Sequence, residues 1–137
     1  MITLAALMLM QGFADTGTAA GHKPDTTVLE QKLGKWKGRW GFDNGKFVCQ
    51  TTQSSGDSAV DSVGCSALIA CLGPEGQRLN AIAQGAGDDR TRADEIQAIA
   101  RKSAPCVADK RRSGLIALAE LRGFTSAPRT KTKEYGR

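Results

Sequence analysis

Four cysteines are the residues of this sequence best suited to form covalent bonds: Cys49, Cys65, Cys71 and Cys106. An even number of cysteines in a small exported domain is typical of disulfides. None of the spacings is the C-x2-C or C-x4-C of a structural zinc site, so we expect disulfides and no metal. If residues 57–72 form a helix, Cys65 and Cys71 are about 9 Å apart along it, whereas a disulfide needs Cα atoms within about 7 Å.

Two pairings remain after this exclusion: Cys49–Cys65 with Cys71–Cys106, or Cys49–Cys71 with Cys65–Cys106. At 100° per residue, the two helical cysteines face directions about 120° apart. One of them can therefore reach the strand that precedes the helix while the other reaches a different segment. This favours Cys49–Cys65 and Cys71–Cys106, and the second pairing stays open.

Acid–base chemistry has no obvious place in this chain. The only histidine, His22, lies in a polar segment near the N-terminus, which argues against a Ser-His-Asp or Cys-His site. Capping and the helix dipole explain the acidic residues at the predicted helix starts. These residues are Asp57, Asp61, Asp88, Asp89, Asp94 and Glu95. Neither a phosphate-binding glycine motif nor an EF-hand spacing is present, so we expect no cofactor, and any enzymatic function would require a two-carboxylate mechanism.

Residues 1–14 have the pattern of a secretory signal peptide. The apolar run Ile2–Met10 is too short to span a bilayer, which takes about 20 helical residues. Small residues end the run, so cleavage is expected before Asp15, with an alternative end at Ala20. We therefore expect a periplasmic or secreted protein, and the cysteines independently favour such an oxidising compartment.

The remaining chain divides into three parts. Residues 15–26 are predicted to be a flexible leader, 27–124 a single globular domain, and 125–137 a basic disordered tail. The formal charge is +5, and much of it lies in the tail. The tail suits either solvent or, weakly, an anionic surface such as lipid headgroups or cell-wall polymer. Nucleic acid is not an expected partner, because the body carries no basic stripe.

Residues 36–52 predict a β-hairpin. Asn44 and Gly45 favour a type I′ turn, in which both central residues need positive φ. Pairing outward from this turn places Trp40 opposite Cys49, and the period of two gives the hairpin one apolar face and one polar face.

The hairpin also holds the possible binding surface, formed by Trp36, Trp40, Arg39 and Lys37. The tryptophans belong to the apolar face and the two basic residues to the polar face. The tryptophan pair is either a part of the core or a ligand platform. A half-buried hairpin is expected to place such side chains in its core, so the core is favoured.

Helices are predicted on both sides of the hairpin, at 26–34, 57–72, 74–84 and 88–102, with a last helix from Pro105 to Gly123. Pro105 separates the last two, because proline is tolerated in a first helical turn and disfavoured in an interior. The expected fold class is α+β: one hairpin packed on a bundle of about four helices and stapled by disulfides.

The stretch from Gly45 to about Leu68 resembles the C-terminal domain of TonB-type energy transducers. The resemblance rests on Gly45, the strand 46–52, the turn Ser54-Ser55-Gly56, Asp61 in the helix, and the cysteines Cys49 and Cys65. It implies a β-β-α core. The chain departs from that family in lacking a long proline-rich linker and a further strand after the helix, which is the strand that would pair with a transporter's peptide. The resemblance therefore implies a different binding task.

These patterns together indicate a small exported, non-catalytic domain that binds a protein partner or an envelope component in the periplasm. One alternative is a carboxylate-dependent cell-wall hydrolase, which would need two carboxylates in one concave site. Another is a secreted inhibitor or immunity protein, stapled against proteolysis.

Overall fold

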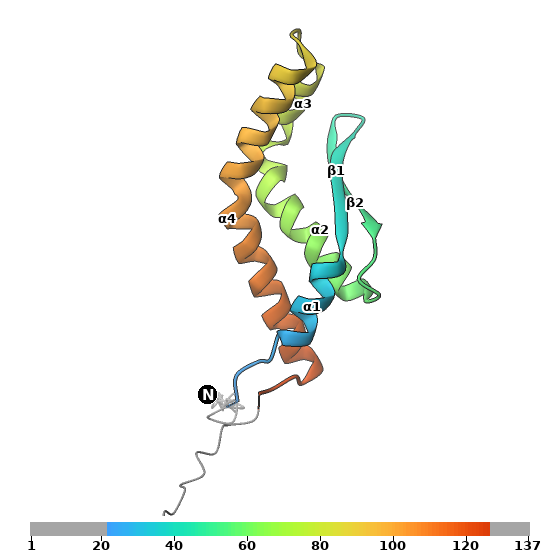
Figure 1. Ribbon diagram of the computed structural model, residues 1–137, viewed down its shortest axis with the longest axis vertical. Helices are drawn as coiled ribbons and strands as arrows, with labels where there is room; N and C mark the ends of the chain where they lie inside the picture. The colour runs from blue at the N-terminus through green and yellow to red at the C-terminus, as the bar shows by residue number, and fades with distance from the viewer. Residues whose placement is uncertain (1–21, 127–137) are drawn as a thin grey trace, which may run out of the picture.

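The computed structural model describes residues 22–126. The predicted signal peptide, residues 15–21 of the leader and residues 127–137 of the tail lie outside this range. The elements in chain order are α1 (Thr27–Lys35), β1 (Lys37–Asp43), β2 (Lys46–Gln53), α2 (Ser58–Leu72), the 3-10 turn η1 (Gly73–Glu75), α3 (Gly76–Gln84) and α4 (Asp89–Arg122). Figure 1 shows an elongated molecule in which α2 lies between the hairpin and the long helix α4. The predicted α+β class is confirmed.

The hairpin has the predicted register. Trp40 pairs with Cys49 and Phe42 with Phe47 across an antiparallel ladder. Asn44 and Gly45 have φ values of 49° and 75°, as a type I′ turn requires. The ladder extends to Gln53, with one irregularity near its open end.

The inner face of the hairpin packs on the helices through three aromatic rings. Trp40 stacks on Phe47 with 5.6 Å between ring centroids, and Phe42 meets both rings edge to face. These rings cover a buried cluster that includes Leu72 and Leu79. The hairpin is therefore held by side-chain packing as well as by its own ladder, because an isolated two-stranded hairpin is only marginally stable.

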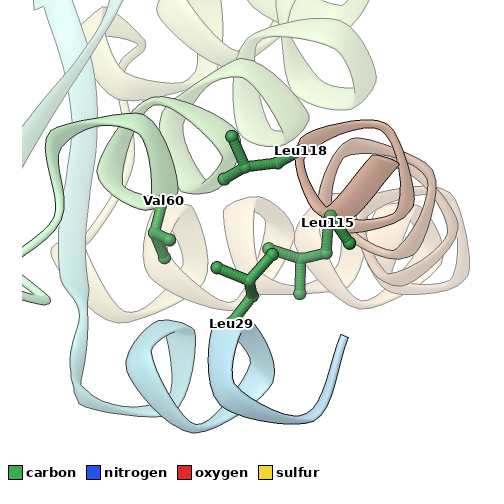
Figure 2. Packing of buried hydrophobic residues seen from close by; sticks show 5 residues of the cluster. Leu29, Val60, Leu115 and Leu118 are labelled. Atoms are coloured by element: carbon green, nitrogen blue, oxygen red, sulfur yellow. The ribbon is translucent and has the colours of Figure 1, made fainter. Parts of the chain in front are cut away.

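A second cluster closes the other end of the domain. In Figure 2, Leu29 from α1, Val60 from α2, and Leu115 and Leu118 from α4 point toward one another. Leu29 and Val60 have no exposed surface. The short helix α1 is thus tied to the long helices by a few fully buried side chains, each contributing roughly 1.5–3 kcal/mol by burial.

Both predicted disulfides are present. Cys49 in β2 bonds to Cys65 in α2, with 5.6 Å between their Cα atoms. Cys71, at the end of α2, bonds to Cys106 in α4, with a Cα separation of 5.9 Å. Bonds of this kind indicate an oxidising, non-cytoplasmic environment.

The prediction of two separate helices at 88–102 and after Pro105 is wrong. Residues Asp89–Arg122 form one helix of 34 residues with Pro105 inside it. An interior proline costs roughly 3 kcal/mol, but here buried residues on both sides of it, Ile99 and Leu115, hold the two halves against the rest of the domain. Within residues 22–126 no helix, α4 included, combines the length and apolar character needed to cross a membrane.

The two ends of the described chain pair with each other, so the folded domain includes residues that were predicted to belong to the leader and the tail. Pro24 and Thr125 form an antiparallel bridge, and the backbone N–H of Asp25 donates to the carbonyl of Phe124 at 2.8 Å. The backbone N–H of Ser126 donates to the carbonyl of Lys23. Residues assigned from the sequence to flexible ends therefore belong to the folded domain, because each segment supplies the hydrogen-bond partners of the other.

Candidate functional site

The four residues of the predicted binding surface do not share one face. Trp36 is 8% exposed, and Trp40 is half-buried in the aromatic group on the inner face of the hairpin. Lys37 and Arg39 are exposed on the outer face. Strand alternation separates the aromatic pair from the basic pair, so the structure does not assemble a tryptophan platform flanked by cations.

The side chain of Trp36 is buried against several parts of the domain. Its indole N–H donates to the hydroxyl of Thr51 at 2.9 Å, and its ring lies against the backbone of Gly64 in α2. A Cβ at Gly64 would come within 2.8 Å of the ring, so glycine is required for this close approach. The guanidinium of Arg111 lies 5.5 Å from the ring centroid, and burial lowers the pKa of Arg111. The indole is a core residue rather than a ligand contact.

The outer face of the hairpin carries a hollow of about 440 Å³. We call it the Gly41 hollow, and its lining comes only from the two strands: Arg39, Trp40, Gly41, Phe42, Asp43, Val48, Cys49 and Gln50. Because no helix residue contributes, the hollow opens on the side away from α2. Gly41 faces Val48 across the ladder and leaves open space where a side chain would stand. Glycine inside a strand often marks such a place of close approach.

Charged and polar side chains surround the apolar part of the hollow, which Gly41 and Val48 form. Arg39 stands opposite Gln50 on one side of Gly41, and Asp43 stands opposite Lys46 on the other. All four side chains are exposed, whereas Val48 is half-buried. Within residues 22–126 no hydrogen bond or ion pair engages the side chain of Arg39 or Asp43. The site therefore presents a forked cation, a carboxylate and an amide to any ligand that fills the glycine gap.

Two carboxylates meet at the start of α2, and their chemistry is structural. Asp57 accepts hydrogen bonds from Arg122 at 2.6 and 2.9 Å, from Lys32 at 3.1 Å, and from two backbone N–H groups of its own helix. The bond from Arg122, with that from Lys32, holds the pKa of Asp57 far below its usual range. Asp57 thus joins α1, α2 and α4, and it stays ionised, which is unsuited to donating a proton.

Asp61 also has a structural role, because it holds the turn that precedes α2. It accepts from the hydroxyls of Ser54 and Ser55 and from the backbone N–H of Ser55, and these bonds lower its pKa. A retained proton is what a two-carboxylate hydrolase needs on one of its two groups. Asp57 and Asp61 both favour the charged form, so this pair lacks the required difference in pKa.

The remaining acidic residues behave as caps or surface groups. Asp88 caps α4 by accepting from the backbone N–H of Thr91, which lowers the pKa of Asp88, and Asp89 pairs with Arg92. The Gly41 hollow and the hollow beside Val28 and Phe124 each contain a single carboxylate, Asp43 and Asp25 respectively, and the hollow between α2 and α4 beside Gly114 contains none. Residues 22–126 contain no group of three His, Cys, Asp or Glu side chains that could hold a metal, and His22 is exposed.

The sequence contained one signal for the Gly41 hollow that strand alternation alone did not reveal. Gly41 occupies a central outward position of β1, between Arg39 and Asp43 in the same row. A glycine with charged residues two positions away on both sides predicts a gap between polar side chains. Val48 lies opposite Gly41 in the other strand and also lines the hollow, so the hollow could be recognised only once the pairing of the two strands was known.

Comparison of the chain with protein-family models, with curated proteins and with solved structures finds no match. The resemblance of residues 45–68 to TonB-type C-terminal domains stays a prediction. The strand, turn and helix on which it rests are present as β2, the turn at Gly56 and α2. This local agreement concerns secondary structure and carries no family assignment.

Proposed function

We propose that the protein is a small exported, non-catalytic domain that binds a protein partner or an envelope component, in the periplasm or outside the cell. The observation that carries this proposal is the Gly41 hollow, a concave, polar-walled site on an outward face. Its volume of about 440 Å³ is within the range of sites that hold a small ligand or a few residues of a peptide.

The support for binding, as opposed to catalysis, comes from how firmly this face is held. The Cys49–Cys65 bond fixes β2 to α2, directly behind the strand pair that lines the hollow. The aromatic rings of the inner face anchor the same strands from below. A site on such a fixed surface loses little conformational entropy when it is occupied, which favours affinity.

Filling the hollow is expected to abolish binding. Gly41→Val places a side chain into open space, so it should leave the fold intact, and Arg39→Glu reverses the charge of one wall. The immobilised protein is exposed to an envelope fraction, and each retained species is quantified by mass spectrometry. Both variants should retain the specific partner at least about tenfold less, the loss typical of a binding hot spot.

Arg101→Glu is the matched control, because Arg101 is an exposed cation on α4 and the substitution changes the net charge equally. It should retain the partner as the unchanged protein does. Equal retention of every species by all four proteins would refute the hollow as the binding site. Equal loss with Arg101→Glu would show attraction to charge in general.

Export is tested separately by the intact mass of the protein recovered outside the cytoplasm. We expect a chain that begins at Asp15, because the apolar run is followed by small residues there. Leu7→Arg interrupts the apolar run and should leave the chain unprocessed in the cytoplasm. A soluble, folded protein that retains Met1–Ala14 would contradict both the signal peptide and the assignment to the periplasm.

A further inference from the structure

The outer face of the hairpin arranges its charges in a pattern that points to one class of ligand for the Gly41 hollow. Arg39, Gly41 and Asp43 occupy successive outward positions of β1, so a cation, a gap and a carboxylate follow one another in one row. Successive positions on one face of a strand lie about 6.7 Å apart, which separates the two charged residues by about 13 Å. The hollow therefore has two ends of opposite charge.

The end at Arg39 offers hydrogen-bond donors. Arg39 and Gln50 stand opposite each other on the two strands, and both line the hollow. A guanidinium carries only donors, arranged in a fork that matches the two oxygens of a carboxylate. Both side chains are exposed, and no carboxylate of residues 22–126 forms an ion pair with Arg39. This end is suited to a carboxylate of the ligand.

The opposite end of the hollow offers an acceptor. Asp43 lines the hollow, whereas Lys46, its neighbour across the ladder, does not. Among the described residues no ion pair joins Asp43 to Lys46 or to any other cation. An ionised carboxylate accepts hydrogen bonds from an ammonium or a guanidinium. This end is suited to a basic group of the ligand.

Between the two ends the hollow is apolar and has room for a side chain. Nothing lies within 4 Å of the point where a Cβ on Gly41 would stand, and Val48 faces Gly41 from β2. Val48 is only half-buried, so a small apolar group placed in this gap would remove more of its surface from water.

We propose that the Gly41 hollow binds an extended peptide in which acidic, apolar and basic residues follow one another at every second position. The peptide's carboxylate pairs with Arg39, its apolar side chain fills the gap at Gly41, and its basic group pairs with Asp43. An extended chain places every second side chain on one side, with the same repeat as the row in β1, so the three contacts form together. This inference rests on the proposed function and names the ligand of that site.

Other envelope components fit the same site less well. The phosphates of a lipid surface or of a cell-wall polymer would meet Arg39 but also the carboxylate of Asp43, and like charges in contact are costly. A neutral polysaccharide would leave both charged groups without an ionic partner while removing water from them. A peptide supplies both charges and the regular spacing.

The test uses three synthetic peptides with blocked ends: Glu-Ser-Val-Ser-Lys, Glu-Ser-Val-Ser-Glu and Lys-Ser-Val-Ser-Lys. Binding to the isotope-labelled, oxidised protein is followed by NMR chemical-shift titration. The mixed peptide should bind at least about tenfold more tightly than either of the others, because only it forms charged hydrogen bonds at both ends. The formal charge of +5 favours the doubly acidic peptide, so general attraction would give a different order.

Asp43→Lys is expected to reverse this preference, so that the doubly acidic peptide binds about tenfold more tightly than the mixed one. Glu95→Lys is the matched control, because Glu95 is an exposed acidic residue on α4, outside the hollow, and the substitution changes the net charge equally. It should keep the preference of the unchanged protein. Gly41→Val should weaken the binding of the mixed peptide at least about tenfold, because it fills the gap.

Three results would overturn this inference: equal affinity for the three peptides, no detectable binding of any of them, or the same preference in Asp43→Lys as in the unchanged protein. If Gly41→Val and Arg39→Glu nevertheless lose the envelope partner, the proposed function stands and the hollow binds a ligand of another class. Undiminished retention of the partner by both variants would refute the proposed function itself.

Discussion

Replacing Trp36 with alanine is expected to lower the free energy of unfolding by about 3–5 kcal/mol, the range for a large aromatic side chain removed from a core. The indole is 8% exposed and lies between the start of β1 and the middle of α2. Its removal leaves a cavity against Gly64, leaves the Thr51 hydroxyl without its donor, and removes the ring beneath Arg111. The measurement is urea unfolding followed by circular dichroism.

Trp36→Phe separates these contributions. It keeps an aromatic ring in place but removes the N–H that donates to Thr51, so it should cost roughly 1–2 kcal/mol. If Trp36→Ala unfolded within about 1 kcal/mol of the unchanged protein, the indole would not be part of the core. The earlier alternative of a tryptophan ligand platform would then regain its basis.

Removing the Cys71–Cys106 bond by a double substitution to alanine is expected to cost about 4 kcal/mol. The bond closes a loop of 35 residues, and loop-closure entropy of the unfolded chain sets this size. A domain of this size is stable by only about 5–15 kcal/mol, so the loss should be visible as a large drop in the denaturation midpoint. Urea unfolding of the oxidised proteins measures it.

The Cys49–Cys65 pair is the internal control. It closes only 16 residues, so the same substitution should cost about 3 kcal/mol. It should also loosen the hairpin, and with it the Gly41 hollow, whereas loss of Cys71–Cys106 should leave partner binding intact under folding conditions. A larger loss of stability from the shorter loop would show that native-state packing, rather than chain entropy, sets the contribution of each bond.

The local parts of this fold could be read from the sequence because their causes are local. Asn44 and Gly45 are the residues that a type I′ turn requires, and the turn then sets the pairing of Trp40 with Cys49. The choice of disulfides followed from the directions that Cys65 and Cys71 face on one helix. Asp57 and Asp88 cap the helices that their positions predicted.

The sequence by itself thus determined the hairpin register and the helix starts at Asp57 and Asp88, because these depend on residues a few positions apart, and it favoured one disulfide pairing without excluding the other. Only the tertiary structure decided that α4 continues through Pro105, because the cost of an interior proline is outweighed by contacts on both sides of it. It also decided that the segments at Lys23 and Ser126 pair, and that Gly41 and Val48 enclose a hollow. In each case the deciding contact comes from a segment distant in the chain or from the partner strand, and local propensity does not specify that contact.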